Sequence, residues 1–293
     1  MKRTKTKPSY NKYGWIFISA AFLLYLIFTI YPAAASLIMA FQTSEGGEMV
    51  FAGLDNFKRM FNDGIFVQSL KNTFLYMVIQ VPIMLILAMF IATLLNSSIL
   101  KAKGFFRTSI FLPCVTSLVA YSILFKMMFS LDGIVNKALM SLGILDAPYQ
   151  YLQDSGWARA VIIIAMLWRW TGYNVIFFLS ALQNIPKETF EAAQVDGANA
   201  FQIFIKVTVP QLKPIILLTA IMSTNGTLQL FDETMNITQG GPANATITVS
   251  HYIYNQSFVY APNFGYASAI SYVVVFIMII LAIIQFSVAG KED

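Results

Sequence analysis

Long apolar segments alternate with shorter polar connections along the whole chain. Six of these segments approach or exceed the roughly 20 residues that an α-helix needs to cross the hydrocarbon core of a membrane. Because a helix satisfies its own backbone hydrogen bonds in lipid, the pattern predicts an all-α polytopic membrane protein with six transmembrane helices. The predicted spans cover residues 14–41, 70–95, 106–129, 158–182, 214–231 and 266–288.

The pattern divides the chain into a polar N-terminal segment, residues 1–13, and a six-span domain, residues 14–293. The first span contains Ala33, Ala34 and Ala35, small residues of the kind found at a signal-peptidase site. Its apolar stretch is longer than the h-region of a signal peptide, and five further spans follow it. We therefore interpret it as an uncleaved first helix.

Composition supports burial in a bilayer. Hydrophobic residues make up 57% of the chain and charged residues 11%, whereas soluble domains carry about 25% charged residues. The net charge of +5 is also found in proteins that bind nucleic acid. Here the basic residues are scattered between apolar segments, so we predict a lipid environment and no nucleic-acid partner.

Cysteine and histidine each occur once, as Cys114 and His251. A disulfide framework, a cysteine metal site or a histidine cluster cannot be built from one residue of each type. We expect His251 to be a packing or surface residue, and we predict no catalytic residue and no metal site. This scarcity also argues against a membrane enzyme.

Basic residues gather in alternate connections, namely the N-terminus, the connections after the second and fourth spans, and the C-terminal tail. The remaining connections are net acidic. Because Lys and Arg accumulate in cytoplasmic loops, this asymmetry predicts that both termini are cytoplasmic. The basic residues concerned are Lys2, Arg3, Lys5, Lys7, Lys12, Lys101, Lys103, Arg107, Lys187, Lys206, Lys213 and Lys291.

The connection after the fourth span, about residues 184–213, is long and amphipathic. Phe190, Ala193, Gly197, Phe201 and Phe204 recur at roughly helical spacing among charged residues. We predict a short helix outside the bilayer that presents an apolar stripe to a partner protein. A helix resting on the lipid surface is the alternative, but such helices are rich in Lys and Arg, whereas this segment begins with acidic residues.

A spaced motif lies in the same connection: Glu191-Ala192-Ala193, three residues, Gly197, nine residues, then Val207 and Val209-Pro210. It resembles the EAA loop of permeases of binding-protein-dependent ABC importers, with the pattern E-A-A, three residues, G, nine residues, I-x-L-P. Val207 replaces Ile and Val209 replaces Leu, which keeps both positions apolar. In that family the loop is a coupling helix that docks in a groove of an ATPase subunit.

The residues of the motif suit that role. Alanine side chains allow close approach to a groove, Gly197 permits a sharp change of backbone direction, and Glu191 opposes the positive end of the helix dipole. Pro210 and Pro214 are expected to end the docking element and begin the fifth span. By resemblance, ATPase coupling is assigned to Glu191, Ala192, Ala193, Asp196, Gly197, Ala198, Phe201 and Pro210 within the 191–210 loop.

Two further stretches resemble the sugar-type permeases of this family. They are Gln239-Gly240-Gly241-Pro242, with the aromatic residues that follow it, and Gly53-Leu54-Asp55-Asn56-Phe57. The resemblance implies a type I ABC importer permease fold and import of oligosaccharides, disaccharides or glycerol phosphates in a bacterial plasma (inner) membrane. It also implies a second homologous permease subunit, two ATPase subunits and an extracellular solute-binding protein as partners.

The chain lacks the G-x-x-x-x-G-K-[ST] loop that binds nucleotide phosphates. We therefore expect a permease subunit that is not itself an enzyme and holds no cofactor. ATP and its Mg²⁺ are expected on the partner ATPase subunits.

Polar residues inside predicted spans are candidates for the substrate pathway, because burying such groups in lipid is costly. They are Arg169, Tyr173, Asn174, Asn225, Gln229 and Asp232. Alternatively, Arg169 anchors the structure by pairing with Asp232 or by snorkelling outward, and Tyr173 and Asn174 form ordinary interhelical hydrogen bonds. With one central cation and acidic residues near the outer mouth, we expect a neutral or oligomeric carbohydrate rather than an anion.

A secondary, ion-coupled transporter is the alternative function. It predicts inverted repeats and a carboxylate in the middle of a span. The sequence shows neither feature, which favours the ATP-driven importer.

Overall fold

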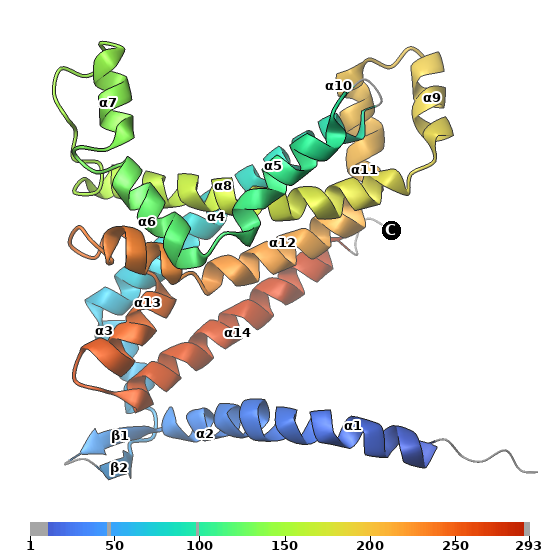
Figure 1. Ribbon diagram of the computed structural model, residues 1–293. Helices are drawn as coiled ribbons and strands as arrows, with labels where there is room; N and C mark the ends of the chain where they lie inside the picture. Colours follow the sequence, from blue (N-terminus) through green and yellow to red (C-terminus); the bar gives the residue numbers. More distant parts are fainter. Residues whose placement is uncertain (1–10, 46–47, 98–99, 290–293) are drawn as a thin grey trace, which may run out of the picture.

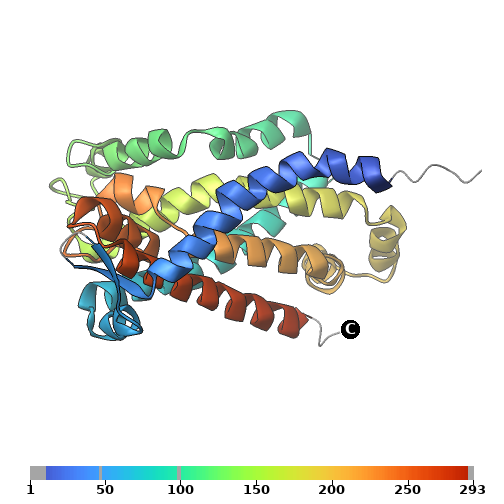
Figure 2. The same cartoon turned by 90° about the horizontal axis from the view of Figure 1, so that it is seen from below.

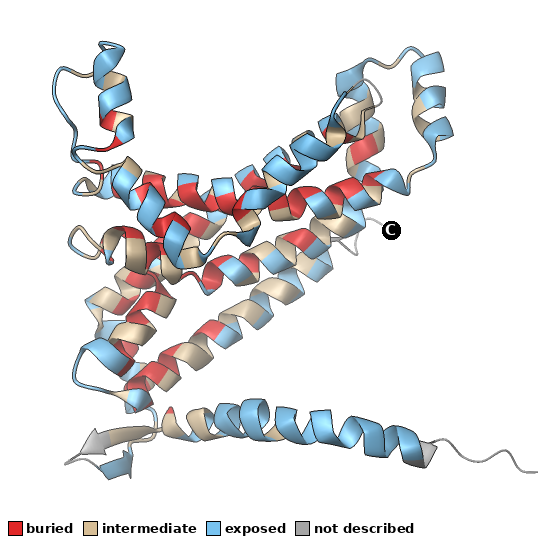
Figure 3. Cartoon of the chain, in the orientation of Figure 1, coloured by how far each residue is buried: buried red, intermediate tan, exposed pale blue. Residues whose placement is uncertain are grey.

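The computed structural model describes residues 11–45, 48–97 and 100–289. Its centre is formed by helices α4 (Gly64–Asn96), α8 (Ser155–Gln183), α12 (Lys213–Leu228) and α14 (Phe264–Ala289), as Figure 1 shows. The core of the molecule lies where α4, α8 and α12 pack together, and Figure 3 shows buried residues concentrated there. Ala88 and Ala92 of α4 are fully buried, and such small side chains let helix backbones approach closely.

The first span is a continuous rod made of α1 (Asn11–Tyr25), the π-helical turn η1 (Leu26–Ile30) and α2 (Tyr31–Met39). It stands apart from the bundle in Figure 1 and crosses it obliquely in Figure 2. Its C-terminal part contacts α14, where the Tyr272 hydroxyl donates to the Ala33 carbonyl. Within the described rod from Tyr13 to Met39, none of the most apolar window is buried, so its side chains face lipid or another subunit.

A strand hairpin and a short helix follow the rod, and the sequence analysis did not predict the hairpin. Strands β1 (Gln42–Glu45) and β2 (Glu48–Phe51) form an antiparallel hairpin in which Thr43 pairs with Val50. Helix α3 (Asp55–Asn62) then leads into α4. Helix α4 begins six residues before the predicted span because the Asp63 carboxylate caps it, accepting hydrogen bonds from the backbone of Ile65 and Phe66.

The third predicted span is broken, and the fifth is preceded by a sharp bend. The third consists of α5 (Lys103–Val115) and α6 (Leu118–Met128), which meet at 97°. Before the fifth, α10 (Ala200–Ile203), η2 (Phe204–Thr208) and α11 (Val209–Gln211) meet α12 at 72°. By length and composition, the described residues contain four single spans, or six when each bent pair counts as one.

Local chemistry explains both breaks. After α5, the Thr116 hydroxyl donates to the Pro113 carbonyl at 2.6 Å and so competes with the next turn of helix. Between α11 and α12, Pro214 has no N–H with which to continue the preceding hydrogen-bond ladder.

The remaining elements gather at the two ends of the bundle (Figure 1). At one end lie the hairpin, α7 (Ile134–Ser141), η3 (Thr234–Thr238), α13 (Val249–Tyr254) and η4 (Asn255–Val259). At the other end lie α9 (Lys187–Val195), the start of α1 and the end of α14. The described ends of the chain therefore share a side with α9, as the charge asymmetry predicted, although which side is cytoplasmic stays a prediction.

Candidate functional site

The predicted docking helix is present as α9, and its end has a defined geometry. Gly197 has φ +79°, the left-handed conformation that glycine adopts without strain. Its N–H donates to the Gln194 carbonyl at 3.0 Å, and the Ala198 N–H donates to the Ala193 carbonyl at 3.0 Å. These two bonds form a Schellman motif, so Gly197 closes α9 and turns the chain sharply.

The next helix begins at once. Asn199 caps α10 by accepting a hydrogen bond from the Gln202 backbone, and the Gln202 side chain accepts one from the Asn199 N–H, both at 2.9 Å. Glu191, Ala192, Asp196 and Gly197 are exposed on this turn. We call residues 187–202 the docking turn.

Apolar side chains on the docking turn are also exposed, with 87% of Val195 and 74% of Phe201 accessible to solvent. An exposed apolar group beside exposed acids suits a protein partner. Pro210 lies apart from the turn, at the start of α11. Ala193 and Ala198 of the docking turn are half-buried.

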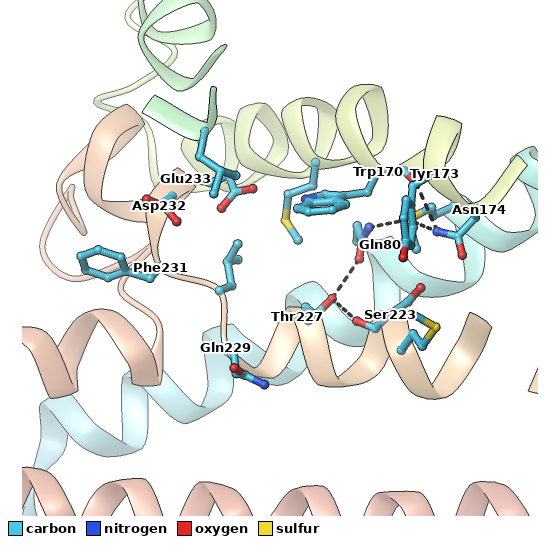
Figure 4. Close-up of a pocket in the computed structure, with 16 residues that line it drawn as sticks. Gln80, Trp170, Tyr173, Asn174, Ser223, Thr227, Gln229, Phe231, Asp232 and Glu233 are labelled. Atoms are coloured by element: carbon cyan, nitrogen blue, oxygen red, sulfur yellow. Dashed lines mark hydrogen bonds between the residues drawn. The ribbon is translucent and has the colours of Figure 1, made fainter. Parts of the chain in front are cut away.

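A second candidate site is a cavity of about 330 Å³ enclosed mainly by α4, α8, α12 and the segment after α12. Figure 4 shows polar side chains from separate elements directed into it. Its polar lining is Gln80, Tyr173, Asn174, Ser223, Thr227, Gln229, Asp232 and Glu233. Its apolar lining is Met84, Leu118, Met166, Trp170, Met222, Leu230 and Phe231, with Gly226 between them.

Hydrogen bonds hold part of this lining in place. The Thr227 hydroxyl lies 3.1 Å from the Gln80 amide oxygen and 2.9 Å from the Ser223 carbonyl. The Asn174 amide donates to the Trp170 carbonyl at 3.2 Å. The cavity therefore combines fixed amide and hydroxyl groups with the aromatic rings of Trp170 and Tyr173, the groups that bind sugar hydroxyls and the apolar faces of sugar rings.

Four of the six predicted pathway residues line the cavity: Tyr173, Asn174, Gln229 and Asp232. Asn225 is half-buried and lies outside the lining. Sequence reasoning missed Gln80, although an amide within the otherwise apolar stretch 77–92 was a usable signal. It also left out Glu233, whose side chain is only 3% exposed and accepts a hydrogen bond from the Tyr121 hydroxyl.

Arg169 lies outside the cavity lining and points toward the break between α5 and α6. One guanidinium nitrogen donates to the Pro113 carbonyl at 3.2 Å and to the carbonyl and hydroxyl of Thr116. In return, the Cys114 thiol donates to the Arg169 carbonyl at 2.9 Å. The cation therefore stabilises the C-terminal end of α5, where the helix dipole is negative.

The ion pair between Arg169 and Asp232, which the sequence analysis gave as an alternative, is not formed. Among the described residues, the one ion pair joins Lys58 and Asp55. The Arg169 guanidinium instead lies 4.9 Å from the centre of the Tyr121 ring. Its contact with Tyr121 places it one side chain away from Glu233.

Comparison with known proteins identifies the relatives of this chain. Residues 61–290 match the family described as "Binding-protein-dependent transport system inner membrane component". The lactose transport system permease protein LacF of Rhizobium radiobacter is 50% identical over 292 residues, covering 99% of this chain and 98% of LacF. The arabinooligosaccharides transport system permease protein AraP of Halalkalibacterium halodurans is 34% identical, covering 94% of this chain and 87% of AraP.

The fold also matches a solved structure. A chain from a bacterial ABC transporter involved in the import of the acidic polysaccharide alginate superimposes with a TM-score of 0.83. The alignment covers 96% of each chain at 22% sequence identity. At that identity the match establishes the shared fold.

Proposed function

This chain belongs to the family of binding-protein-dependent transport system inner membrane components, and from that premise we propose that it carries a neutral oligosaccharide through the cavity between α4, α8 and α12. It is a permease subunit of an ABC importer, so the secondary transporter considered from the sequence is not supported. The relatives named for lactose and arabinooligosaccharides support a carbohydrate as the substrate.

The cavity is the observation that carries the proposal. Its volume of about 330 Å³ falls within the range of small-molecule sites, and its lining combines apolar side chains and aromatic rings with amides, hydroxyls and carboxyl groups. Trp170 and Tyr173 stack against the sugar ring, while Asn174 and Gln80 bind its hydroxyls.

In this proposal, ATP hydrolysis by partner subunits drives transport through the cavity. The docking turn inserts into a groove of an ATPase subunit, and α11 and α12 transmit the movement to the cavity wall. ATP and Mg²⁺ bind to two such ATPase subunits. A second permease subunit covers the exposed rod of the first span, and an extracellular solute-binding protein delivers the sugar.

The proposed orientation places the docking turn and both termini in the cytoplasm. Single cysteines at Asp146 and Gln194, both exposed, test it in a Cys114→Ser background. A membrane-impermeant maleimide should label Asp146→Cys in intact cells and Gln194→Cys after permeabilisation. Labelling of Gln194→Cys in intact cells would reverse the orientation.

Blocking the cavity tests the substrate pathway. Gly226 lies in the cavity lining and a Cβ atom there meets no atom within 4 Å, so we expect the side chain of Gly226→Trp to fill part of the cavity. We expect the complete importer carrying this variant to assemble normally but to lose uptake of lactose in proteoliposomes. Unchanged uptake would refute the cavity as the pathway.

A further inference from the structure

Glu233 occupies an unusual position in the cavity wall. Its carboxyl group is almost entirely buried, and Figure 4 shows it directed toward the Trp170 side of the cavity. The Tyr121 hydroxyl donates to one carboxyl oxygen, Oε1. Tyr121 is itself 2% exposed, so this bond fixes the carboxyl in the cavity wall.

No cation in the lining balances this carboxyl. Among the described residues that enclose the cavity, none is Lys, Arg or His, whereas Asp232 adds a second acidic group beside Glu233. The nearby Arg169 donates to the carbonyls at the end of α5. Burial raises the pKa of the Glu233 carboxyl, and the hydrogen bond from Tyr121 works against that rise. The cavity therefore presents acidic groups and no cation among its described lining residues.

An acid-lined cavity distinguishes between classes of sugar. Carboxylate oxygens accept hydrogen bonds from sugar hydroxyls, and charge-assisted bonds of this kind are stronger than neutral ones. A sugar that carries its own carboxylate would meet acidic groups with no cation beside them, and two carboxyl groups that share a site excluding water cannot both be ionised without a large cost. Repulsion of a competitor is a common source of specificity.

We propose that Glu233, positioned by Tyr121, is a specificity-determining residue that accepts a hydroxyl of a neutral sugar and excludes acidic sugars from the cavity. The inference rests on the proposed function, because it assumes that the cavity binds the transported sugar. It sets this chain apart from the structural relative whose transporter imports an acidic polysaccharide.

Direct binding to the assembled importer tests the inference. Saturation-transfer NMR on the complex in nanodiscs, without its binding protein, measures Kd for lactose and for lactobionate, which carries a carboxylate. We expect the wild type to bind lactose more tightly by on the order of tenfold. Glu233→Gln keeps an oxygen for the Tyr121 hydroxyl but removes the ionisable group, so the preference for lactose should fall below about twofold.

Matched variants separate the possible failures. Asp146→Asn makes the same charge change on an exposed loop and should leave the preference intact. Gly226→Trp should abolish both NMR signals; if lactose still binds, the proposed pathway fails. If lactose binding depends on the cavity but Glu233→Gln retains the wild-type preference, the role of Glu233 is refuted and the pathway stands.

Discussion

The Tyr266 hydroxyl donates a 2.7 Å hydrogen bond to Oδ2 of Asp63, which lies 203 residues earlier in the chain. The same oxygen accepts a bond from the Tyr252 hydroxyl, and Oδ1 caps the start of α4. The Arg59 guanidinium lies 4.0 Å from the centre of the Tyr266 ring. One carboxylate thus joins α4, α13 and α14 at the end of the bundle opposite the docking turn.

Asp63→Asn should lower the free energy of unfolding by about 1–3 kcal/mol, because two buried tyrosine hydroxyls lose a charged acceptor. Burial raises the pKa of Asp63, but hydrogen bonds from Tyr252, Tyr266 and the α4 backbone together lower it below the usual 3.8. A lowered carboxyl pKa stabilises the fold above the usual value, and that contribution is lost as pH falls through the folded-state pKa. Thermal unfolding in nanodiscs between pH 5 and 2.5 measures both effects.

Asp55→Asn is the matched control. Asp55 forms an exposed ion pair with Lys58, and such pairs contribute about 0–1 kcal/mol. If the two variants lower the free energy of unfolding equally, the contacts of Asp63 stabilise the fold no more than the exposed ion pair does.

His251 should make the fold sensitive to acid in a higher pH range. It is buried in α13, outside the candidate spans, with Nδ1 3.1 Å from the Thr234 hydroxyl. Burial lowers the pKa of His251 from 6.5 to about 4. Between these two pKa values His251 is protonated in the unfolded chain but not in the folded chain. The free energy of unfolding should therefore fall as pH drops from 6.5 toward 4.

Thermal unfolding between pH 7 and 4 measures this loss, and His251→Gln should flatten the curve in that range because glutamine does not titrate. Asp63 acts below this range, so the two contributions are separable. An unchanged slope in His251→Gln would assign the acid sensitivity to another group.

Hydropathy located the spans but could not show their shape. Pro113 and Thr116 lie within an apolar stretch, so the break between α5 and α6 leaves the hydropathy pattern of one continuous helix. The direction of Arg169 followed from that break, because the carbonyl groups it binds are free only where α5 ends. For a continuous helix, the reasonable expectation was that Arg169 faces a cavity or pairs with a carboxylate.

At the docking turn, the spacing of the motif predicted a local backbone conformation, which hydropathy could not do. Gly197 was expected to permit a change of direction, and its left-handed conformation confirms the expectation. In the cavity, Tyr173 and Asn174 were identified as polar residues in one span. Gln80 comes from another span, and its proximity to Tyr173 and Asn174 depends on helix packing that one sequence does not reveal. Glu233 directly follows Asp232, but the sequence alone does not show that its side chain is buried in the cavity wall.

Gly172→Ala should destabilise the contact between α5 and α8. A Cβ at Gly172 would lie 2.0 Å from the backbone oxygen of Ile110, so the helices would have to separate. Overpacking of this kind typically costs about 1–3 kcal/mol, seen as a lower unfolding temperature.

Gly226→Ala is its control, since the new methyl group meets no atom within 4 Å. It should change the unfolding temperature little. If both alanine variants are equally stable, α5 and α8 are not in close contact in the membrane.

Gly197→Val should abolish transport while the protein remains inserted in the membrane. Valine adopts the left-handed conformation at φ +79° with difficulty, at a cost of about 1–2 kcal/mol, so the Schellman bonds to Gln194 and Ala193 should break. The docking turn would then present Val195 and Glu191 to the ATPase in the wrong orientation. Uptake of a neutral oligosaccharide that the wild type carries, ATPase co-purification and membrane content measure the effect.

Gly197→Asn provides the control, because asparagine tolerates the left-handed region and also ends helices in this motif. It should keep most of the transport, so the difference between the two variants reports backbone conformation rather than loss of glycine itself. Glu191→Lys tests the same exposed surface by charge reversal and should also weaken ATPase binding. If Gly197→Val and Glu191→Lys both import the oligosaccharide and retain the ATPase at wild-type levels, the docking turn is not the coupling element, because neither its shape nor its charge would then matter to the partner.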